Sequence, residues 1–332
     1  MKLFDKYNRQ HDYLRLSVTD RCNLNCSYCN PHKSSDNFKN HNTLLSFEEI
    51  VRIVEIFVNR FEFKKIRLTG GEPFARKDIV SLIRSLNELK IVTPFELLAT
   101  SNGILIEDKI EELFQSGIDR FNFSLDTLHQ DKFIDITGFN RFNQSMKSIQ
   151  SAINIGNKKL KLNTVIMRGI NDDELIDFVD FAVNNDITIR FIEYMPFANN
   201  GYDKSKFISY KEMIEIISEK YILQKSNEEI GSVSKNFTVE KHSGRISFIT
   251  SISDHFCDSC NRLRLTSDGK LKLCLFSLND QDLDLRSLLR NGKSDNEIED
   301  TIIGFISNKL EMHDELDKLI NFKHNSMISI GG

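Results

Sequence analysis

The chain has 332 residues, and its 44 basic and 48 acidic side chains give a formal net charge of −4. No excess of positive charge points to nucleic acid as a partner, and no apolar run approaches the roughly 20 residues that a membrane-spanning helix needs. Charges within the first six residues interrupt any signal-peptide core. A chain of this length can bury an ample core without disulfides, so its six cysteines predict thiols in a reducing cytoplasm.

Residues 12 to 220 alternate apolar strand-like runs with amphipathic helical patterns. Strands are predicted at residues 14–19, 65–69, 95–100, 120–126, 159–167 and 187–195. Helices are predicted at residues 46–60, 78–89, 107–116, 142–155 and 172–183, and a capping box formed by Ser46 and Glu49 opens the first of them. Such alternation forms parallel βαβ units, so the sequence predicts an open sheet or partial barrel with functional residues at the carboxyl ends of its strands.

The character of the sequence changes after about residue 225. Short strands are predicted at residues 237–242 and 245–250, and an antiparallel hairpin at 262–266 and 270–276 surrounds the turn Ser267-Asp268-Gly269. A last helix is predicted at residues 295–309. We therefore divide the chain into a first domain, residues 1–225, and a C-terminal antiparallel β and helical extension, residues 226–332.

Three thiols follow the first predicted strand in the sequence Cys22-Asn-Leu-Asn-Cys26-Ser-Tyr-Cys29. Three thiolates on one short loop can ligate three irons of a cubane [4Fe–4S] cluster, which leaves the fourth iron open. An open iron that takes a non-protein ligand is one route into radical chemistry. A zinc site of three cysteines completed by His32 is the alternative.

A second group of three thiols lies near the end of the chain. Cys257 and Cys260 form a CxxC pair in a predicted loop, and Cys274 lies on the far strand of the predicted hairpin. A zinc site completed by His255 is again the alternative. Two separate groups of three thiols favour two clusters, each with one open iron.

Four predicted strands each place a basic residue between apolar neighbours. These residues are Arg15, Arg67, Lys161 and Arg190. If helices cover the outside of the sheet, the apolar neighbours face them and the cations point inward. Buried cations need an anion, and phosphate suits arginine by bidentate geometry. Pairing with an interior carboxylate such as Glu193 is the alternative.

Two further features lie close to the thiols. Arg262 and Arg264 share one strand face just after Cys260, either as a phosphate contact or as an ordinary solvated face. The sequence Thr69-Gly70-Gly71-Glu72-Pro73 follows the second predicted strand, where glycines let the backbone approach a ligand closely. Together these features predict an oligophosphate substrate between two clusters.

Several motifs give the chain a resemblance to a known family. They are LRLSVTDRCNLNCSYC, KIRLTGGEPFARKD, TSNG, FNFSLD, RGINDDE, IRFIEYMPF, FCDSCNRLRLTSDGKLKLCLF and a terminal GG, and they run from residue 14 to residue 332. The chain resembles the radical S-adenosylmethionine (SAM) enzymes and, within them, the GTP 3',8-cyclase family of molybdenum cofactor biosynthesis. The resemblance implies an α/β fold, namely an incomplete parallel (β/α)6 barrel whose C-terminal extension carries a second [4Fe–4S] cluster.

The resemblance also implies roles for particular residues. The SAM-binding cluster is held by Cys22, Cys26 and Cys29, and SAM is contacted by Tyr28, Gly71, Ser124 and Met195. The second cluster, whose open iron contacts the guanine base, is held by Cys257, Cys260 and Cys274. GTP is contacted by Arg15, Arg67, Thr100, Lys161, Arg262, Leu263 and Arg264, with added phosphate charge from Lys65 and Arg190. The tail, Gly331 and Gly332, reaches the active site and is needed for turnover.

The reaction that the resemblance implies begins with one-electron cleavage of SAM. The resulting 5'-deoxyadenosyl radical takes a hydrogen atom from C3' of GTP, and C3' then bonds to C8, which gives (8S)-3',8-cyclo-7,8-dihydroguanosine 5'-triphosphate. The implied partners are a flavodoxin- or ferredoxin-type electron donor, cyclic pyranopterin monophosphate synthase as recipient of the product, and a second copy in a homodimer. A peptide-modifying radical SAM enzyme with an auxiliary cluster and a non-catalytic zinc module are the alternatives.

Overall fold

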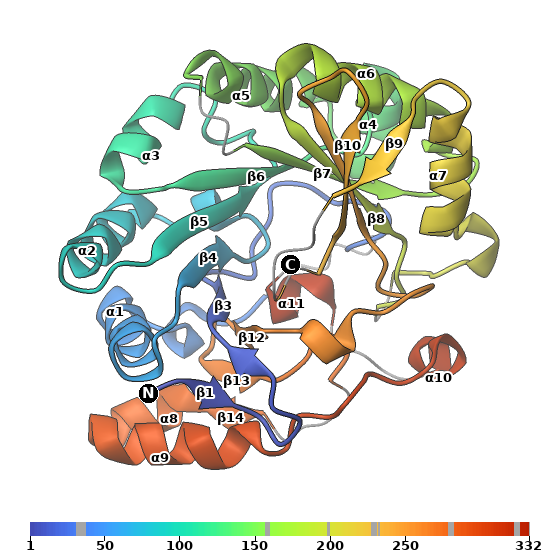
Figure 1. Ribbon diagram of the computed structural model, residues 1–332. Helices are drawn as coiled ribbons and strands as arrows, with labels where there is room; N and C mark the ends of the chain where they lie inside the picture. The colour runs from blue at the N-terminus through green and yellow to red at the C-terminus, as the bar shows by residue number, and fades with distance from the viewer. Residues whose placement is uncertain are drawn as a thin grey trace.

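The strands of the protein are arranged in one long, curved sheet (Figure 1). A computed structural model describes residues 1–30, 38–156, 160–197, 200–226, 231, 233–277, 282–321 and 326–331. Within these residues, twelve strands form the sheet in the order β14-β13-β12-β3-β4-β5-β6-β7-β8-β11-β10-β9. The remaining two strands, β1 (Leu3–Phe4) and β2 (Gln10–His11), form a separate antiparallel pair.

The middle of the sheet consists of parallel strands in chain order, as the sequence predicts. They are β3 (Tyr13–Ser17), β4 (Lys65–Thr69), β5 (Glu96–Ser101), β6 (Arg120–Ser124), β7 (Lys161–Ile166) and β8 (Thr188–Glu193). Each pairs in parallel with the next. This α/β arrangement is consistent with a partial barrel of the TIM type.

Helices connect these strands and cover the outer face of the sheet in Figure 1. They are α1 (Phe47–Glu55, continued by a π-helical turn at Ile56–Arg60), α2 (Ile79–Val92), α3 (Ile110–Ser116), α4 (Gln130–Thr137), α5 (Phe142–Asn154), α6 (Leu175–Asn185) and, after β8, α7 (Tyr210–Ser218). The capping box of Ser46 and Glu49 is confirmed at the start of α1. The sequence analysis missed α4 and α7.

The later strands extend both edges of the parallel row. They are β9 (Leu223–Lys225), β10 (Lys235–Val239), β11 (Arg245–Ile249), β12 (Arg262–Leu265), β13 (Lys270–Lys272) and β14 (Leu283–Asp284). The predicted antiparallel hairpin is confirmed as β12 and β13. In addition, β12 pairs in parallel with β3, and β11 pairs in parallel with β8, which the sequence did not predict.

The last part of the chain adds helices beside and below the sheet in Figure 1. They are α8 (Leu285–Arg290), α9 (Asp295–Ile306), α10 (Leu316–Asn321) and α11 (Met327–Ile330), of which α9 matches the predicted last helix. The short α11 lies on the concave side of the sheet, near the carboxyl ends of the parallel strands. No helix in the described residues combines the length and the apolar character required to cross a membrane.

Side chains alternate across the parallel strands and separate an apolar face from a polar one. In β3, Leu14 and Leu16 are fully buried in the main hydrophobic core, which lies between the sheet and its helices. Arg15, between them, lines a cavity on the concave face, and Arg190 of β8 does the same. The expected inward direction of these two cations is therefore confirmed.

Candidate active site

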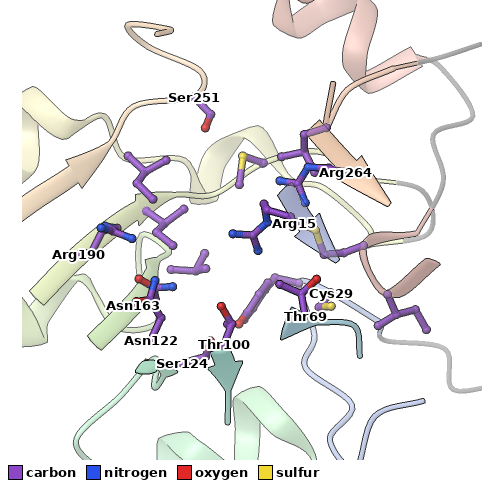
Figure 2. Close-up of a pocket in the computed structure, with 18 of the residues that line it drawn as sticks. Arg15, Cys29, Thr69, Thr100, Asn122, Ser124, Asn163, Arg190, Ser251 and Arg264 are labelled. Carbon is purple, nitrogen blue, oxygen red and sulfur yellow. The ribbon is translucent and has the colours of Figure 1, made fainter. Parts of the chain in front are cut away.

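A cavity of about 300 Å³ lies on the concave face of the sheet, and Figure 2 shows part of its wall. Side chains from β3 to β8 contribute to this wall, together with residues from β12 and the loops around it. All six cysteines line the cavity, and all six are free thiols. The fold therefore brings the two thiol groups, which are far apart in the sequence, to a single space.

The first thiol group lies on a loop after β3 that hydrogen bonds hold in place. The amide of Cys29 donates to the carbonyl of Cys26 at 3.0 Å, and the Ser27 amide donates to the Ile136 carbonyl of α4 at 2.9 Å. Burial, together with the nearby Cys22 and Asp126, raises the pKa of Cys29 to about 12. Thiols so buried ionise readily only when a metal centre stabilises the thiolate, so this donor set fits an iron–sulfur cluster. His32, the fourth ligand of the zinc alternative, lies outside the described residues.

The second thiol group surrounds the start of β12. Cys257 begins a 3₁₀ turn, Cys257–Ser259, and Cys260 follows it. Cys274 lies two residues beyond the end of β13, which stops at Lys272, and not on the strand as predicted. Burial raises the pKa of Cys257 and of Cys274. For Cys260, burial is outweighed by Lys309 and by a hydrogen bond from the Arg262 backbone, so the pKa falls.

Within the ranges given above, no group of three or more His, Cys, Asp or Glu side chains is arranged to hold a single metal ion directly. His255, the proposed fourth ligand of the second zinc alternative, lines the cavity. Iron–sulfur clusters fit this cavity because of its donor atoms. Each of the two thiol groups contributes three cysteines to the cavity wall, and cysteine thiolates are the usual ligands of such clusters.

Four arginines form the cationic part of the cavity wall: Arg15, Arg190, Arg262 and Arg264. Burial, with the other arginines, lowers the pKa of Arg190 to about 9 and that of Arg264 to about 10. The buried Nε atoms of Arg190 and Arg262 have no hydrogen-bond partner within the part of the chain that the structure describes. Because a group of buried cations is costly without an anion, this wall fits a ligand that carries several negative charges.

Glu193, the carboxylate that could have paired with these cations, accepts hydrogen bonds from other groups instead. Its carboxylate accepts hydrogen bonds from the amides of Tyr210 at 3.1 Å, Ile252 at 2.9 Å and Ser253 at 3.0 Å. The Ser253 hydroxyl donates to it as well. Glu193 therefore fixes the loop after β11, and none of the ion pairs in the described residues joins it to Arg190.

Other predicted substrate contacts lie outside the cavity wall. Arg67 is buried, donates to the Tyr13 hydroxyl, and donates to the Ala99 carbonyl at 3.1 Å. Leu263 is fully buried in the core, and Lys161 and Lys65, the first residues of β7 and β4, are not among the described residues that line the cavity. Their contacts with GTP remain predictions, and Arg67 reaches the cavity through Tyr13.

Tyr13 was missed by the sequence analysis although it lines the cavity. Its ring lies between two cations, with the Arg262 guanidinium 5.2 Å and the Arg67 guanidinium 5.9 Å from the ring centroid. Burial raises its pKa, but Arg67, Arg262 and Arg15 outweigh burial and lower it to about 7. An aromatic residue at the start of a strand carries no local signal for such a role.

The residues predicted to contact SAM lie near the first thiol loop. Tyr28, Gly71, Ser124 and Met195 all line the cavity, and the Tyr28 hydroxyl donates to Asp126 at 2.8 Å. A Cβ atom on Gly71 would lie 2.4 Å from the Arg21 carbonyl oxygen, so only glycine fits against the thiol loop there. The GGEP loop and the first thiol loop therefore form one unit.

Polar side chains between the two thiol groups have atoms that lack partners. Among the described residues, the buried Oγ1 of Thr69 and of Thr100 and the Oδ1 of Asn122 and of Asn163 find no hydrogen-bond partner, although all four residues line the cavity (Figure 2). Thr100 was predicted as a substrate contact, whereas Asn122 and Asn163 were missed. The alternation that predicts the inward cations also turns these two asparagines inward, and this is the signal in the sequence that could have identified them.

Glu72 is a buried carboxyl group in this wall. It accepts hydrogen bonds from the Ser101 hydroxyl at 2.9 Å, the Asn102 amide at 2.8 Å and the Phe74 amide at 3.2 Å. Burial outweighs these bonds and raises its pKa to about 7. Glu72 joins the loop after β4 to the end of β5, which positions Thr100 beside the cavity.

We expect Glu72→Gln to change how stability depends on pH. Between pH 4.5 and 7 the folded chain keeps a proton that the unfolded chain has lost, so the free energy of unfolding falls as pH rises. Glutamine does not titrate, so the variant should lack this dependence. As pH rises through that window, its free energy of unfolding should increase relative to that of the unsubstituted chain by up to about 3 kcal/mol. Denaturant unfolding at pH 5 and pH 8 measures the change. Glu88→Gln, at an exposed position of α2, is the control. If the stability of both variants depended on pH in the same way, the raised pKa would not belong to Glu72.

The C-terminal tail packs against the carboxyl ends of β3 and β4. Gly331 is buried with a φ of 85°, and a Cβ atom on it would lie 2.8 Å from Ser17 Cβ and 3.2 Å from Thr69 Oγ1. Ile330, just before it, packs with Phe197 and Phe276 in a second hydrophobic cluster. The structure thus places Gly331 next to Thr69 of the cavity wall, while Gly332 lies outside the described residues.

We expect Gly331→Ala to displace this tail. Its left-handed φ costs a non-glycine residue about 1–2 kcal/mol, and the contact with Ser17 adds to that cost, so docking of the tail should weaken at least about tenfold. Limited proteolysis of the C-terminus and turnover with substrate both report docking. Gly292→Ala is a matched control, because Gly292 has a φ of 73° but nothing within 4 Å of its Cβ position. Tail protection equal in both variants would show that close approach at Gly331 is unimportant.

Sequence comparisons place this site among known proteins. Residues 16–182 match the Radical SAM superfamily, and residues 187–315 match the family Molybdenum Cofactor Synthesis C. Molybdenum cofactor biosynthesis protein 1 of Dictyostelium discoideum is 41% identical over 99% of this chain, which spans about half of that protein (52%). Mitochondrial GTP 3',8-cyclase of Arabidopsis thaliana is 40% identical over 99% of this chain and 83% of its own length.

A second cyclase and a solved structure are also similar to this chain. GTP 3',8-cyclase of Clostridium perfringens is 39% identical over 99% of both chains. The solved structure of Streptococcus suis SuiB bound to S-adenosylmethionine has a TM-score of 0.62 and 18% identity, and the match covers 91% of this chain and 69% of SuiB. At that identity the likeness shows the radical SAM fold alone. The relatives that match along almost their whole length show that this chain belongs to the GTP 3',8-cyclase family of radical SAM proteins.

Proposed function

We propose that the chain catalyses the radical cyclisation of GTP to (8S)-3',8-cyclo-7,8-dihydroguanosine 5'-triphosphate, the first step of molybdenum cofactor biosynthesis. The observation that carries this proposal is the cavity: two groups of three thiols face one space, and four arginines lie in its wall. The names of the relatives at about 40% identity support it. A triphosphate nucleoside has both the anionic charge and the length that such a space would accept.

The cofactors of the family are SAM and two [4Fe–4S] clusters. In our proposal, Cys22, Cys26 and Cys29 hold the cluster that binds SAM, and Cys257, Cys260 and Cys274 hold the second. When bound, the first cluster and SAM supply one-electron cleavage of a carbon–sulfur bond and thereby a carbon radical that can remove a hydrogen atom. The second cluster supplies an open iron for the guanine base.

The residues of the chain itself bind and orient the substrate. Arg15, Arg190, Arg262 and Arg264 hold the phosphates by charge and hydrogen bonding, and Thr100 contacts the nucleoside in the cavity. Tyr28, Gly71, Ser124 and Met195 hold SAM. Holding the ribose against the reacting carbon is the main contribution of the protein, because orientation supplies much of the rate in such reactions.

The division into domains follows the same lines. We propose that residues 1–225, as a parallel (β/α)6 barrel, bind SAM, and that residues 226–332 form the extension that binds the second cluster and brings the GG tail to the site. The pairing of β12 with β3 supports this, since it places Arg264 beside Arg15. The remaining proposals are a cytoplasmic location, a homodimer, a flavodoxin- or ferredoxin-type donor, and transfer of the product to cyclic pyranopterin monophosphate synthase.

Peptide modification, the alternative from the sequence, has weaker support. A solved structure of SuiB bound to its precursor peptide resembles this chain with a TM-score of 0.58, but at 16% identity that likeness concerns the fold alone. The relatives named as cyclases match the whole chain at more than twice that identity. The non-catalytic zinc module is likewise not favoured by membership of a radical SAM family.

One experiment tests the proposed reaction directly. The anaerobically reconstituted protein is incubated with GTP, SAM and a chemical reductant, with ATP replacing GTP in a parallel sample. We expect 5'-deoxyadenosine to form in step with the cyclised nucleotide, and only with GTP. A protein that contains about eight irons, as two cubanes require, but forms no GTP-dependent 5'-deoxyadenosine would overturn the proposal.

A further inference from the structure

A buried lysine contacts the second thiol group. Lys309 follows the end of α9 and is only 4% exposed. Its ammonium group donates to the carbonyl of Arg262 at 2.9 Å and lies 3.9 Å from the Sγ atom of Cys260, within hydrogen-bonding range for sulfur. A buried ammonium needs acceptors, so the position of Lys309 is fixed by these two contacts.

Arg9 joins the same region to the N-terminal hairpin. One of its Nη atoms donates to the carbonyl of Cys257 at 3.0 Å and to that of Glu311 at 2.6 Å, and the other donates to the carbonyl of Leu310 at 2.6 Å. Its Nε atom donates to the Asp5 carboxylate at 2.6 Å. Arg9 thus ties Cys257 to the two residues that follow Lys309, and so it fixes the distance between Lys309 and the thiols.

The two thiol groups differ in the charges that surround them. Lys309, Arg262 and Arg9 act electrostatically on Cys260, and Lys309 and Arg264 act on Cys274. The charged group that acts on Cys26 and Cys29 from outside their own loop is instead the carboxyl group of Asp126. The environment of the second group is therefore cationic, and that of the first is not.

We propose that Lys309, held in place by Arg9, is a positioning residue for the second cluster, which it makes easier to reduce than the first. This inference rests on the proposed function, because it requires a cluster on Cys257, Cys260 and Cys274. Reduction adds one negative charge to a cluster, and a fixed cation with an N–H···S contact stabilises that charge. A more positive potential at the second cluster lets it hold an electron next to the substrate, while the first cluster remains the stronger reductant.

The test compares reduction potentials in full-length chains that hold one cluster each. In the first background, alanine replaces Cys22, Cys26 and Cys29, so that only the second group can bind iron. Lys309→Met removes the charge at nearly constant length, and Lys309→Arg keeps it. Lys241→Met is the control, because Lys241 is 86% exposed and its recorded ion pair, with Glu240, is long at 4.0 Å. Each protein is titrated anaerobically and followed by electron paramagnetic resonance.

We expect Lys309→Met to shift the midpoint potential of the second cluster to more negative values. Lys309→Arg and Lys241→Met should leave this potential near the value found in the protein with both lysines unchanged. In the opposite background, with Cys257, Cys260 and Cys274 replaced, Lys309→Met should not move the potential of the first cluster. Loss of second-cluster iron in Lys309→Met but not in Lys309→Arg would also support the role, since the two variants differ in the charge and the donor.

Two other results would count against the inference. A fully loaded Lys309→Met protein with an unchanged midpoint overturns it and leaves the proposed reaction intact. Equal shifts of both clusters overturn it as well, because they indicate a general change of the fold. If the second group binds no iron even with Lys309 present, the proposed function fails in its assignment of the second cluster, which is a distinct outcome.

Discussion

Replacement of Cys22, Cys26 and Cys29 by alanine should abolish SAM cleavage completely. Without three thiolates no cluster is held on the loop after β3, so no iron is open to SAM and no electron reaches its sulfonium group. The iron content should fall from about eight to about four per chain, because the second group keeps its cubane. Iron and sulfide analysis of anaerobically purified protein, with assay of 5'-deoxyadenosine, measures both effects.

The matched variant replaces Cys257, Cys260 and Cys274 by alanine. It should lose the same amount of iron, but it should keep slow SAM cleavage that no longer depends on GTP. The two variants then separate radical formation from substrate binding. If the first variant still forms 5'-deoxyadenosine, or if both variants keep all their metal as zinc, the assignment of the thiols is wrong.

Replacement of Arg15 by glutamine should weaken GTP binding much more than SAM binding. Arg15 lies in the cavity wall next to Arg264, and a hydrogen bond between charged groups contributes about 1.5–3 kcal/mol, which corresponds to roughly 10- to 150-fold in affinity. Because SAM is proposed to bind at the first thiol loop, its affinity should change little. Equilibrium binding of each ligand to the reconstituted protein measures the difference.

Two other arginines serve as comparisons for Arg15. Arg84→Gln, on the exposed side of α2, should leave both affinities unchanged. Arg67→Gln should have a smaller effect on GTP than Arg15→Gln, because Arg67 contacts a backbone carbonyl and Tyr13 and acts on the cavity through Tyr13. Equal losses of GTP and SAM affinity in Arg15→Gln would contradict the phosphate assignment.

Residues close together in the chain were predictable where a local rule governs them. The Ser46 and Glu49 capping box gave the start of α1, since both hydrogen bonds lie within one helical turn. Alternation within one strand gave the inward direction of Arg15 and Arg190. The same rule was applied to Lys161, yet Lys161 is the first residue of β7, and Asn163 and Val165, nearer its carboxyl end, line the cavity instead. Alternation selects the face of a strand but not the end at which a ligand binds.

Residues that meet across long stretches of chain were not predictable in this way. Arg9, Lys309 and the second thiol group come from three separate segments, and nothing near any of them in the sequence indicates that they touch. Tyr13 acquires its cationic neighbours only because β12 and β4 lie on either side of β3. Buried contacts of this kind depend on which strand edges remain free when the sheet forms.

The sequence by itself determined the chemistry that this protein offers. Cysteine spacing, within one loop for the first group and across one predicted hairpin for the second, defined both ligand groups, and strand alternation defined a set of inward cations, because each pattern is local in the chain. Tertiary structure decided which of these groups share a space. Parallel pairing of β12 with β3 and of β11 with β8 brings the late strands to both edges of the sheet, so both thiol groups and four arginines line one cavity. Such pairing leaves no local signal, since backbone hydrogen bonds between strands do not depend on side-chain identity.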